Sequence, residues 1–240
     1  DSGIRSQRIG DTRTVQEGDP GSAVFMQVPA GNGTYTVTDN SSNQGNAYWT
    51  SATVSNASAW VADTYSLSFT AADSWEVRNS GGTLVGSGSY TSGQSIAFAG
   101  VSIGFEGTPV AGDQFVVAQS GFQSVFKTVQ DFLTTLDVDT GSPEGRAAFQ
   151  NRLNSNLMNI DQSLQHLGNI QSQVGARLAT IDRQQSSNAD MSLDLSQSIS
   201  VIRDLDYASA ISRLEQQLNS LEAAQKAYTR TRSLSLFDIL

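Results

Sequence analysis

The chain has 240 residues and a formal net charge of −9, from 14 Lys and Arg against 23 Asp and Glu. Only 15% of its residues are charged, and a dispersed acidic surface disfavours both nucleic acid phosphates and anionic lipid. No apolar run approaches the roughly 18 residues that span a bilayer, so neither nucleic acid nor membrane is an expected partner. Cysteine is absent, which excludes a disulfide framework, a thiolate metal site and a cysteine nucleophile.

The first half of the chain, up to about residue 118, has many turn residues between short β-branched and aromatic runs. This pattern predicts an antiparallel β domain of about eight to ten short strands. Gly81-Gly82, between two strand-like runs, predicts a tight hairpin turn with positive φ. Gly86-Ser87-Gly88 begins like a dinucleotide-binding motif, but it precedes no helix and is interpreted as a β-turn.

Beyond Gln119 the hydrophobic period changes to that of a helix. The first helix is expected to end near Asp137, because Gly141-Ser142-Pro143 breaks it, and Ser142 and Pro143 then suit the cap and first turn of the next helix. The apolar face of the first helix is made of Phe122, Val125, Phe126, Val129, Phe132, Leu133 and Leu136.

The next helix has the most regular pattern in the chain, a narrow apolar seam interrupted only at Gln171. One helix cannot bury such a seam alone, so a partner helix is expected, although an ordinary bundle core would give the same periodicity. We call these residues the helical seam: Leu153, Leu157, Ile160, Leu164, Leu167, Val174, Leu178 and Ile181.

Two further helical runs follow, one from Met191 to Leu205 and one from Tyr207 onward. The apolar face changes phase at residues 203–207 without Gly or Pro, which indicates one continuing helix whose face turns to a different neighbour. We call the second run the C-terminal stripe: Tyr207, Ile211, Leu214, Leu218 and Leu221.

A search for catalytic or metal-binding residues finds no convincing site. His166 is the single histidine, it falls on the predicted solvent side of the seam helix, and a triad or metal cluster would need further ligands. The residues after Asp137 start like a calcium loop, but Ser142 and Ala148 stand where Gly and a bidentate Glu are needed. Asp204 and Asp206 point in different directions on a helix. No catalytic residue, cofactor site or metal site is therefore predicted.

The tail of the chain resembles the flagellin family. Residues 202–211 (IRDLDYASAI) are similar to the entry of that family's C-terminal helix, and residues 234–240 (LSLFDIL) to its terminal signature. Residues 211–218 (ISRLEQQL) and 221–225 (LEAAQ) look like hook-associated protein 3, the hook–filament junction branch. Residues 98–109 and 112–115 are similar to hook-associated proteins just before their helical return. The resemblance is strong over about 95–240 and weaker over 1–94.

This resemblance implies an α+β fold, in which a turn-rich antiparallel β domain is followed by long helices of a flagellin-like coiled coil or bundle. It also implies a structural subunit that joins hook to filament without catalysis, extracellular in the flagellum and exported by the flagellar type III system without a cleaved signal peptide. The implied partners are hook-associated protein 1, flagellin, further copies in a helical ring and an export chaperone. Family members begin with long helices that pair with the C-terminal ones, so this chain is expected to be a C-terminal fragment.

The expected domains are a β-rich outer domain at 1–118, a helical rod at 119–206 and an assembly helix at 207–240. The first 15 or so residues of the outer domain are expected to lead in from the helical domain. The expected assembly interface combines the C-terminal stripe with two terminal leucines, Leu234 and Leu236. The assembly helix is expected to be disordered in the free subunit and to fold on its neighbours.

Two alternatives remain open. The chain could be flagellin, the filament subunit of the same structural class. From a different class, the β domain could bind carbohydrate or act as an adhesin, with Trp49, Trp60 and Trp75 as stacking platforms. Core or strand-pairing roles for these tryptophans are the simpler interpretation.

Overall fold

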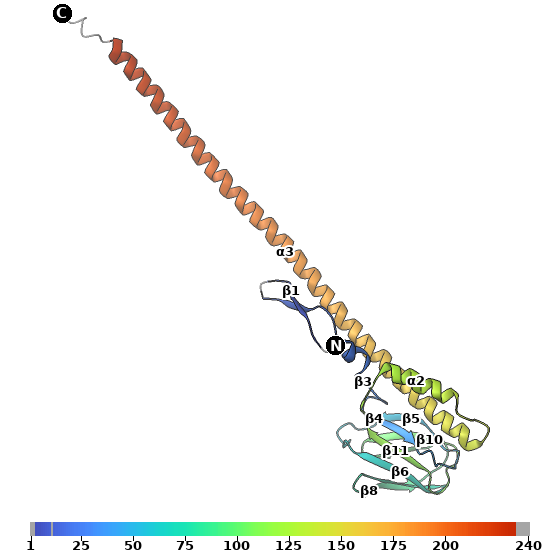
Figure 1. Ribbon diagram of the computed structural model, residues 1–240. Coiled ribbons are helices and arrows are strands. Elements are labelled where there is room, and N and C mark those ends of the chain that lie inside the picture. The colour runs from blue at the N-terminus through green and yellow to red at the C-terminus, as the bar shows by residue number, and fades with distance from the viewer. Residues whose placement is uncertain (1–2, 11, 234–240) are drawn as a thin grey trace, which may run out of the picture. The chain divides into compact units, whose positions relative to one another are not determined.

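The computed structural model describes residues 3–10 and 12–233, apart from the side chains at 205, 206 and 233. The chain divides into two compact units, Asp1–Arg177 and Leu178–Leu240. Antiparallel sheets precede the long helices in sequence, so the predicted α+β class is confirmed (Figure 1). Among the described residues, no helix is long and apolar enough to cross a membrane.

Eight strands of the first unit form a β sandwich of two antiparallel sheets. The larger sheet has the strand order β4-β11-β6-β7-β8 and the smaller one the order β5-β10-β9. The larger sheet consists of β4 (Tyr35–Asp39), β6 (Thr64–Ala71), β7 (Ser74–Arg78), β8 (Leu84–Ser89) and β11 (Gln114–Gln119). The smaller sheet consists of β5 (Tyr48–Val54), β9 (Ser95–Phe98) and β10 (Val101–Glu106).

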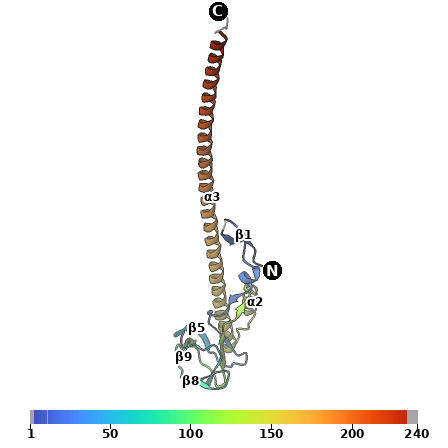
Figure 2. The same cartoon turned by 90° about the vertical axis from the view of Figure 1, so that its left-hand side faces the viewer.

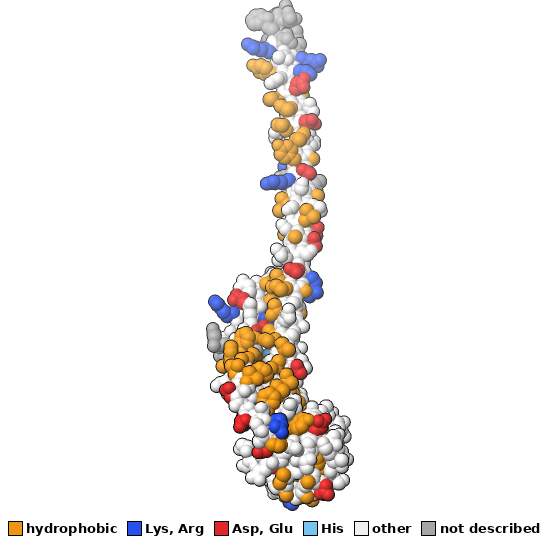
Figure 3. Space-filling model, turned by 90° about the vertical axis from the view of Figure 1, so that its right-hand side faces the viewer, with side chains coloured by type: hydrophobic (Ala, Val, Ile, Leu, Met, Phe, Trp, Pro, Cys, Tyr) orange, Lys and Arg blue, Asp and Glu red, His pale blue; other side chains and the backbone are white. Residues whose placement is uncertain are grey.

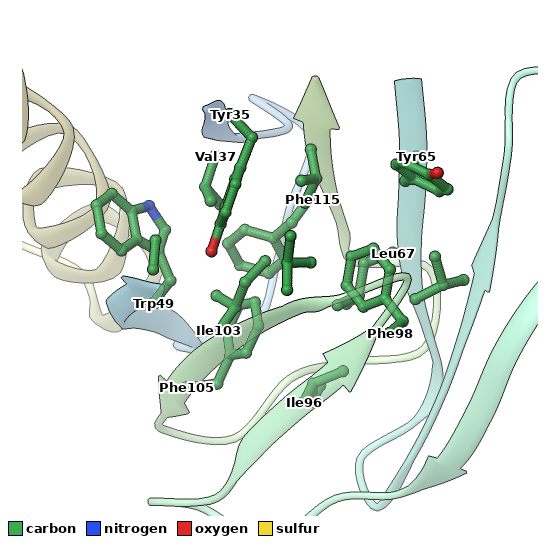
Figure 4. Packing of buried hydrophobic residues seen from close by; sticks show 14 of the residues in the cluster. Tyr35, Val37, Trp49, Tyr65, Leu67, Ile96, Phe98, Ile103, Phe105 and Phe115 are labelled. Atoms are coloured by element: carbon green, nitrogen blue, oxygen red, sulfur yellow. The ribbon is translucent and has the colours of Figure 1, made fainter. Parts of the chain in front are cut away.

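Alternation of apolar and polar residues along these strands places aromatic rings between the two sheets (Figure 4). Phe115 of the larger sheet packs edge-on against Phe105 of the smaller one, with ring centroids 4.9 Å apart. Each buried phenylalanine contributes roughly 1.5–3 kcal/mol. Tyr35 joins the sheets by donating its hydroxyl to the carbonyl oxygens of Thr53 and Ser102, at 3.1 and 3.3 Å. Burial raises the pKa of that hydroxyl.

The glycines between and within β7 and β8 have two different roles. Gly82 has φ of 76° in the hairpin turn between β7 and β8, as predicted. The β-turn predicted at residues 86–88 is wrong, because Gly86 and Gly88 lie inside β8. A Cβ at Gly88 would lie 3.0 Å from the ring of Trp75, so glycine there lets the ring pack on the strand.

Short ribbons lie on either side of the sandwich in sequence. Ala30 donates its backbone N–H to the carbonyl oxygen of Gly121 at 2.9 Å, so the chain enters and leaves the sandwich at one place. Eleven strands of the described chain precede Ser120, more than the eight to ten expected, because the short ribbon strands carry no alternating pattern. The ribbon elements are β1 (Ser6–Arg8), β2 (Thr14–Gln16), β3 (Val28–Pro29), β12 (Phe122–Gln123) and the short helix α1 (Gly21–Phe25).

Two helices complete the described chain. Helix α2 (Val125–Leu136) begins after Ser124, whose hydroxyl accepts the backbone N–H of Lys127 at 3.1 Å. It starts three residues later than predicted because Phe122 pairs in β12. Helix α3 (Pro143–Ser233) begins at the predicted proline, and Ser142 accepts the N–H of Gly145 at 3.1 Å. It runs unbroken through the phase change at 203–207, as predicted.

Candidate assembly surfaces

Helix α2 leaves most of its apolar side exposed, although Val125 and Phe132 are half-buried. Its buried residues are Thr128 and Thr135, whereas Phe126 is 66% exposed and forms a ring pair with Phe25 of α1, with centroids 6.1 Å apart. Figure 3 shows hydrophobic side chains gathered on this side of the first unit. The exposed group, which we call the α2 face, comprises Phe25, Met26, Phe122, Phe126, Val129, Leu133 and Leu136. Large contiguous apolar patches on proteins mark interaction sites, so the α2 face is a candidate interaction surface.

The predicted helical seam lies partly uncovered on α3. Leu157 and Leu164 are 48% and 62% exposed, and Val174 is exposed as well. Leu153, Ile160 and Leu167 are half-buried. In the second unit, Leu178 and Ile181 are exposed too. Much of the seam is therefore available to a partner.

The C-terminal stripe is exposed along its whole length. Tyr207 is 74% exposed, and Leu214, Leu218 and Leu221 are each 56% exposed. Leu234 and Leu236 of the predicted interface lie outside the described residues. An apolar stripe in water gains nothing from the hydrophobic effect until a partner covers it.

A set of polar side chains on α3 holds the sandwich, and sequence reasoning missed it. Asn151 accepts the backbone N–H of Trp49 at 2.9 Å, and Asn154 donates to the carbonyl oxygen of the same residue at 2.7 Å. Ser155 donates to Val37 at 3.2 Å, and Asn159 accepts the N–H of Gly31 at 2.7 Å. We call Asn151, Asn154, Ser155 and Asn159 the polar joint.

The polar joint covers two open strand edges, because β5 and β4 end their sheets and carry backbone groups that no neighbouring strand can pair. Figures 1 and 2 both place the beginning of α3 beside the sandwich. The sequence does contain a signal for this joint, namely four asparagines within residues 151–159. Asparagine is unfavourable in a helix interior, so this cluster indicates side chains that bond to groups outside the helix.

Asp39 and Arg152 line a polar cavity of about 320 Å³ beside this joint. Burial raises the pKa of the Asp39 carboxyl, and the charge of Arg152 offsets only part of that effect. Asn156, which is buried and donates to the Thr135 hydroxyl at 2.7 Å, also lines the cavity. The described residues contain no cluster of three His, Cys, Asp or Glu side chains that could hold a metal ion.

His166 does not lie free on the solvent side as predicted. It is half-buried, and its Nε2 lies 3.0 Å from the carbonyl oxygen of Ala23 in α1. Arg177 forms an ion pair with Asp19, just before α1. Both contacts attach the α1 segment to α3, which gives His166 a structural role.

The three tryptophans pack within the sandwich. Trp49 is only 2% exposed, and Trp60 packs at a tilt between Tyr35 and Tyr65, with ring centroids 5.6 and 5.5 Å away. Trp75 lies over β8 and donates its indole N–H to Ser89 at 3.1 Å. Their contacts are those of core and strand-packing residues, in line with the simpler interpretation.

Comparison with known proteins gives a consistent group of relatives. Residues 38–119 match the family model "Flagellar hook-associated protein 1, D2-like domain". FlgL of Xanthomonas campestris is 34% identical, with a TM-score of 0.72, over 78% of this chain and 62% of that one. Flagellar hook-associated protein-3 of Legionella pneumophila is 30% identical, with a TM-score of 0.79, over 85% of this chain and 66% of that one. A search of curated proteins gave no match.

The β sandwich, the exposed helical faces and these matches together make the chain similar to flagellar hook-associated proteins over most of its length. The solved relatives of 30–34% identity carry the names FlgL and hook-associated protein-3, and one of them is described as a flagellar junction protein. The resemblance to hook-associated protein 3 found in the sequence is thereby confirmed. These relatives are structural proteins and not enzymes. The chain spans 62–66% of the length of the first of them.

Proposed function

We propose that the protein containing this chain is a structural subunit of the bacterial flagellum that joins hook to filament through helix packing. The observation that supports this most directly is the C-terminal stripe, whose five residues are all exposed on one long helix. Their four- and three-residue spacing is that of a coiled-coil seam, which is stable only when another helix covers it. The likeness to flagellar junction proteins supports the same proposal.

The proposed partners are hook-associated protein 1 on the hook side, flagellin on the filament side and further copies in a helical ring. An export chaperone could cover the stripe before assembly, because an exposed apolar stripe on an unassembled subunit favours aggregation. The proposed location is extracellular, at the hook–filament junction, after export by the flagellar type III system. The helical seam is proposed to pack against a partner helix in the same assembly.

A charge placed on the C-terminal stripe tests the proposal. Leu218→Asp in the full-length protein would place a carboxylate in the buried seam, where its desolvation cannot be offset. We expect export without attachment, so that flagellin appears as unattached monomer in the medium. Gln216→Asp adds the same charge on the opposite side of the helix and should leave filaments attached. Normal filaments on cells that produce the Leu218→Asp variant would contradict the proposal.

The flagellin alternative is distinguished by stoichiometry and polymerisation. A junction subunit forms one short ring per flagellum, whereas a filament subunit polymerises along the whole filament. Long filaments formed by the purified full-length protein alone would favour flagellin. Labelled protein confined to the base of the filament would favour the junction role.

A further inference from the structure

The indole N–H of Trp49 has no acceptor in the described part of the protein. The side chain is 2% exposed, and its Nε1 is the one buried side-chain nitrogen or oxygen atom of the described residues without a hydrogen-bond partner. Leaving a buried donor unpaired costs its full desolvation energy, so such groups in folded proteins are bonded to protein or to ordered water.

Trp49 lines a cavity of about 160 Å³ between β4 and α3. Figure 4 shows the indole nitrogen on the side of Val37, which is another wall residue of this cavity. The cavity also receives polar side chains from the sandwich, from β12 and from the polar joint: Thr36, Thr38, Gln123, Ser155 and Asn159.

The chemical groups in the cavity wall indicate which class of ligand can bind there. It contains hydroxyl and amide groups but no Asp, Glu, Lys, Arg or His, so it offers no counter-charge to an ion. A water molecule needs a space of about 10–15 Å³ and two to four polar partners, and this cavity provides both. A serine or threonine hydroxyl keeps its acceptor lone pairs when it donates, as Ser155 does to Val37.

We propose that ordered water binds in this cavity, accepts the Trp49 indole N–H and bridges it to polar groups on α3. The sandwich is then held on α3 by water as well as by the direct bonds of the polar joint. The polar cavity of about 320 Å³ shares Thr38, Ser155 and Asn159 with this one, so the bound water can exchange with solvent along that side. This proposal does not depend on the flagellar function.

Nuclear magnetic resonance of the whole chain with ¹⁵N-labelled tryptophan tests the proposal. Three indole signals are expected, each assigned by its Trp→Phe variant. The Trp49 indole proton should cross-relax with water with the sign of a rigid contact inside the protein. The Trp75 indole, bonded to Ser89, should give no such contact. Absence of a water contact at Trp49 would overturn the proposal, as would a protein acceptor for its N–H.

A matched pair of variants tests the bridge to α3. Ser155→Ala removes a wall hydroxyl and should shift the Trp49 indole proton and speed its exchange with solvent several-fold. Ser163→Ala removes another buried hydroxyl of α3, which donates to Asn159 at 2.8 Å but does not line the cavity, and should leave the Trp49 signal in place. Equal responses of the Trp49 signal to both variants would refute the bridge.

Discussion

At the residue scale, the asparagines of α3 replace a missing strand. Asn151 and Asn154 bracket Trp49 as an adjacent strand would, one accepting its N–H and the other donating to its carbonyl. The helix gives up some intrinsic propensity for these bonds, since asparagine ranks among its poorer formers. The hydrogen bonds outweigh this loss of helix propensity because the joint is buried, and an unpaired backbone group there would have no water to bond.

Asn151→Ala should lower the free energy of unfolding of the first unit by about 1–3 kcal/mol, because the Trp49 N–H loses its acceptor while still buried. Urea unfolding followed by tryptophan fluorescence measures this. Asn219→Ala, at an exposed position of the same helix, should be neutral or slightly stabilising. Equal stability of the two alanine variants would show that the joint contributes little.

Asp39 gives the first unit a distinctive dependence on pH. Because burial raises its pKa, the folded state binds a proton more readily than the unfolded state, and stability falls as pH rises from the ordinary carboxyl pKa through the raised one. Asp39→Asn cannot ionise, so it should be more stable than the wild type at pH 7. That advantage should disappear below the ordinary pKa. Urea midpoints at pH 7 and pH 3.5 measure the difference.

Asp63→Asn provides a control of opposite sign. Hydrogen bonds from Ser80 and from the backbone N–H of Thr64 lower the pKa of the Asp63 carboxyl, so its contribution is present at neutral pH and is lost on acidification. The asparagine variant should therefore be less stable than the wild type at pH 7. A fall in stability for Asp39→Asn at pH 7 would contradict our account of its burial.

At the element scale, the sequence predicted which helices and strands exist better than it predicted which way their apolar faces point. The caps at Ser142 and Pro143 follow from local chemistry and are found as expected. The direction of the α2 apolar face does not follow from periodicity, which is the same whether a face meets its own core or a partner. Phe126 is exposed, whereas Thr128 is buried. The Asn side chains of the joint were missed because their partners are backbone groups more than 100 residues away.

The helix in the second unit should be marginally stable before assembly. Its side chains across residues 207–232 are exposed, and the i,i+4 pair of Glu222 and Lys226 adds only about 0.3–0.5 kcal/mol. We expect weak amide protection across Leu214–Leu221 in the monomer and strong protection after assembly, measured by hydrogen exchange. Residues 65–69 of β6, in the sandwich core, provide the protected reference. Strong protection of Leu214–Leu221 in the monomer would contradict assembly-coupled folding.

At the scale of the whole molecule, the chain enters and leaves the β sandwich through two segments that lie next to each other. Ala30 and Gly121 are joined by a backbone hydrogen bond of 2.9 Å, and Ser120 donates its side-chain hydroxyl to Ala30 at 2.7 Å. The two chain segments pair as β3 and β12 immediately outside this point. The sandwich can therefore be removed without stretching the chain that remains.

Deleting residues 31–120 and joining Ala30 to Gly121 through two glycines tests whether the sandwich is needed for assembly. A cut inside β10 would leave Phe105 and Phe115 without half of their core, whereas this cut removes both sheets completely. If the helical faces carry assembly, the full-length protein with this deletion should still be exported and hold filaments on the hook. Electron microscopy of cells and assay of shed flagellin measure this.

The matched control is the same deletion carrying Leu218→Asp, which should lose attachment. Complete loss of attachment by the exported deletion alone would assign an essential role in assembly to the sandwich.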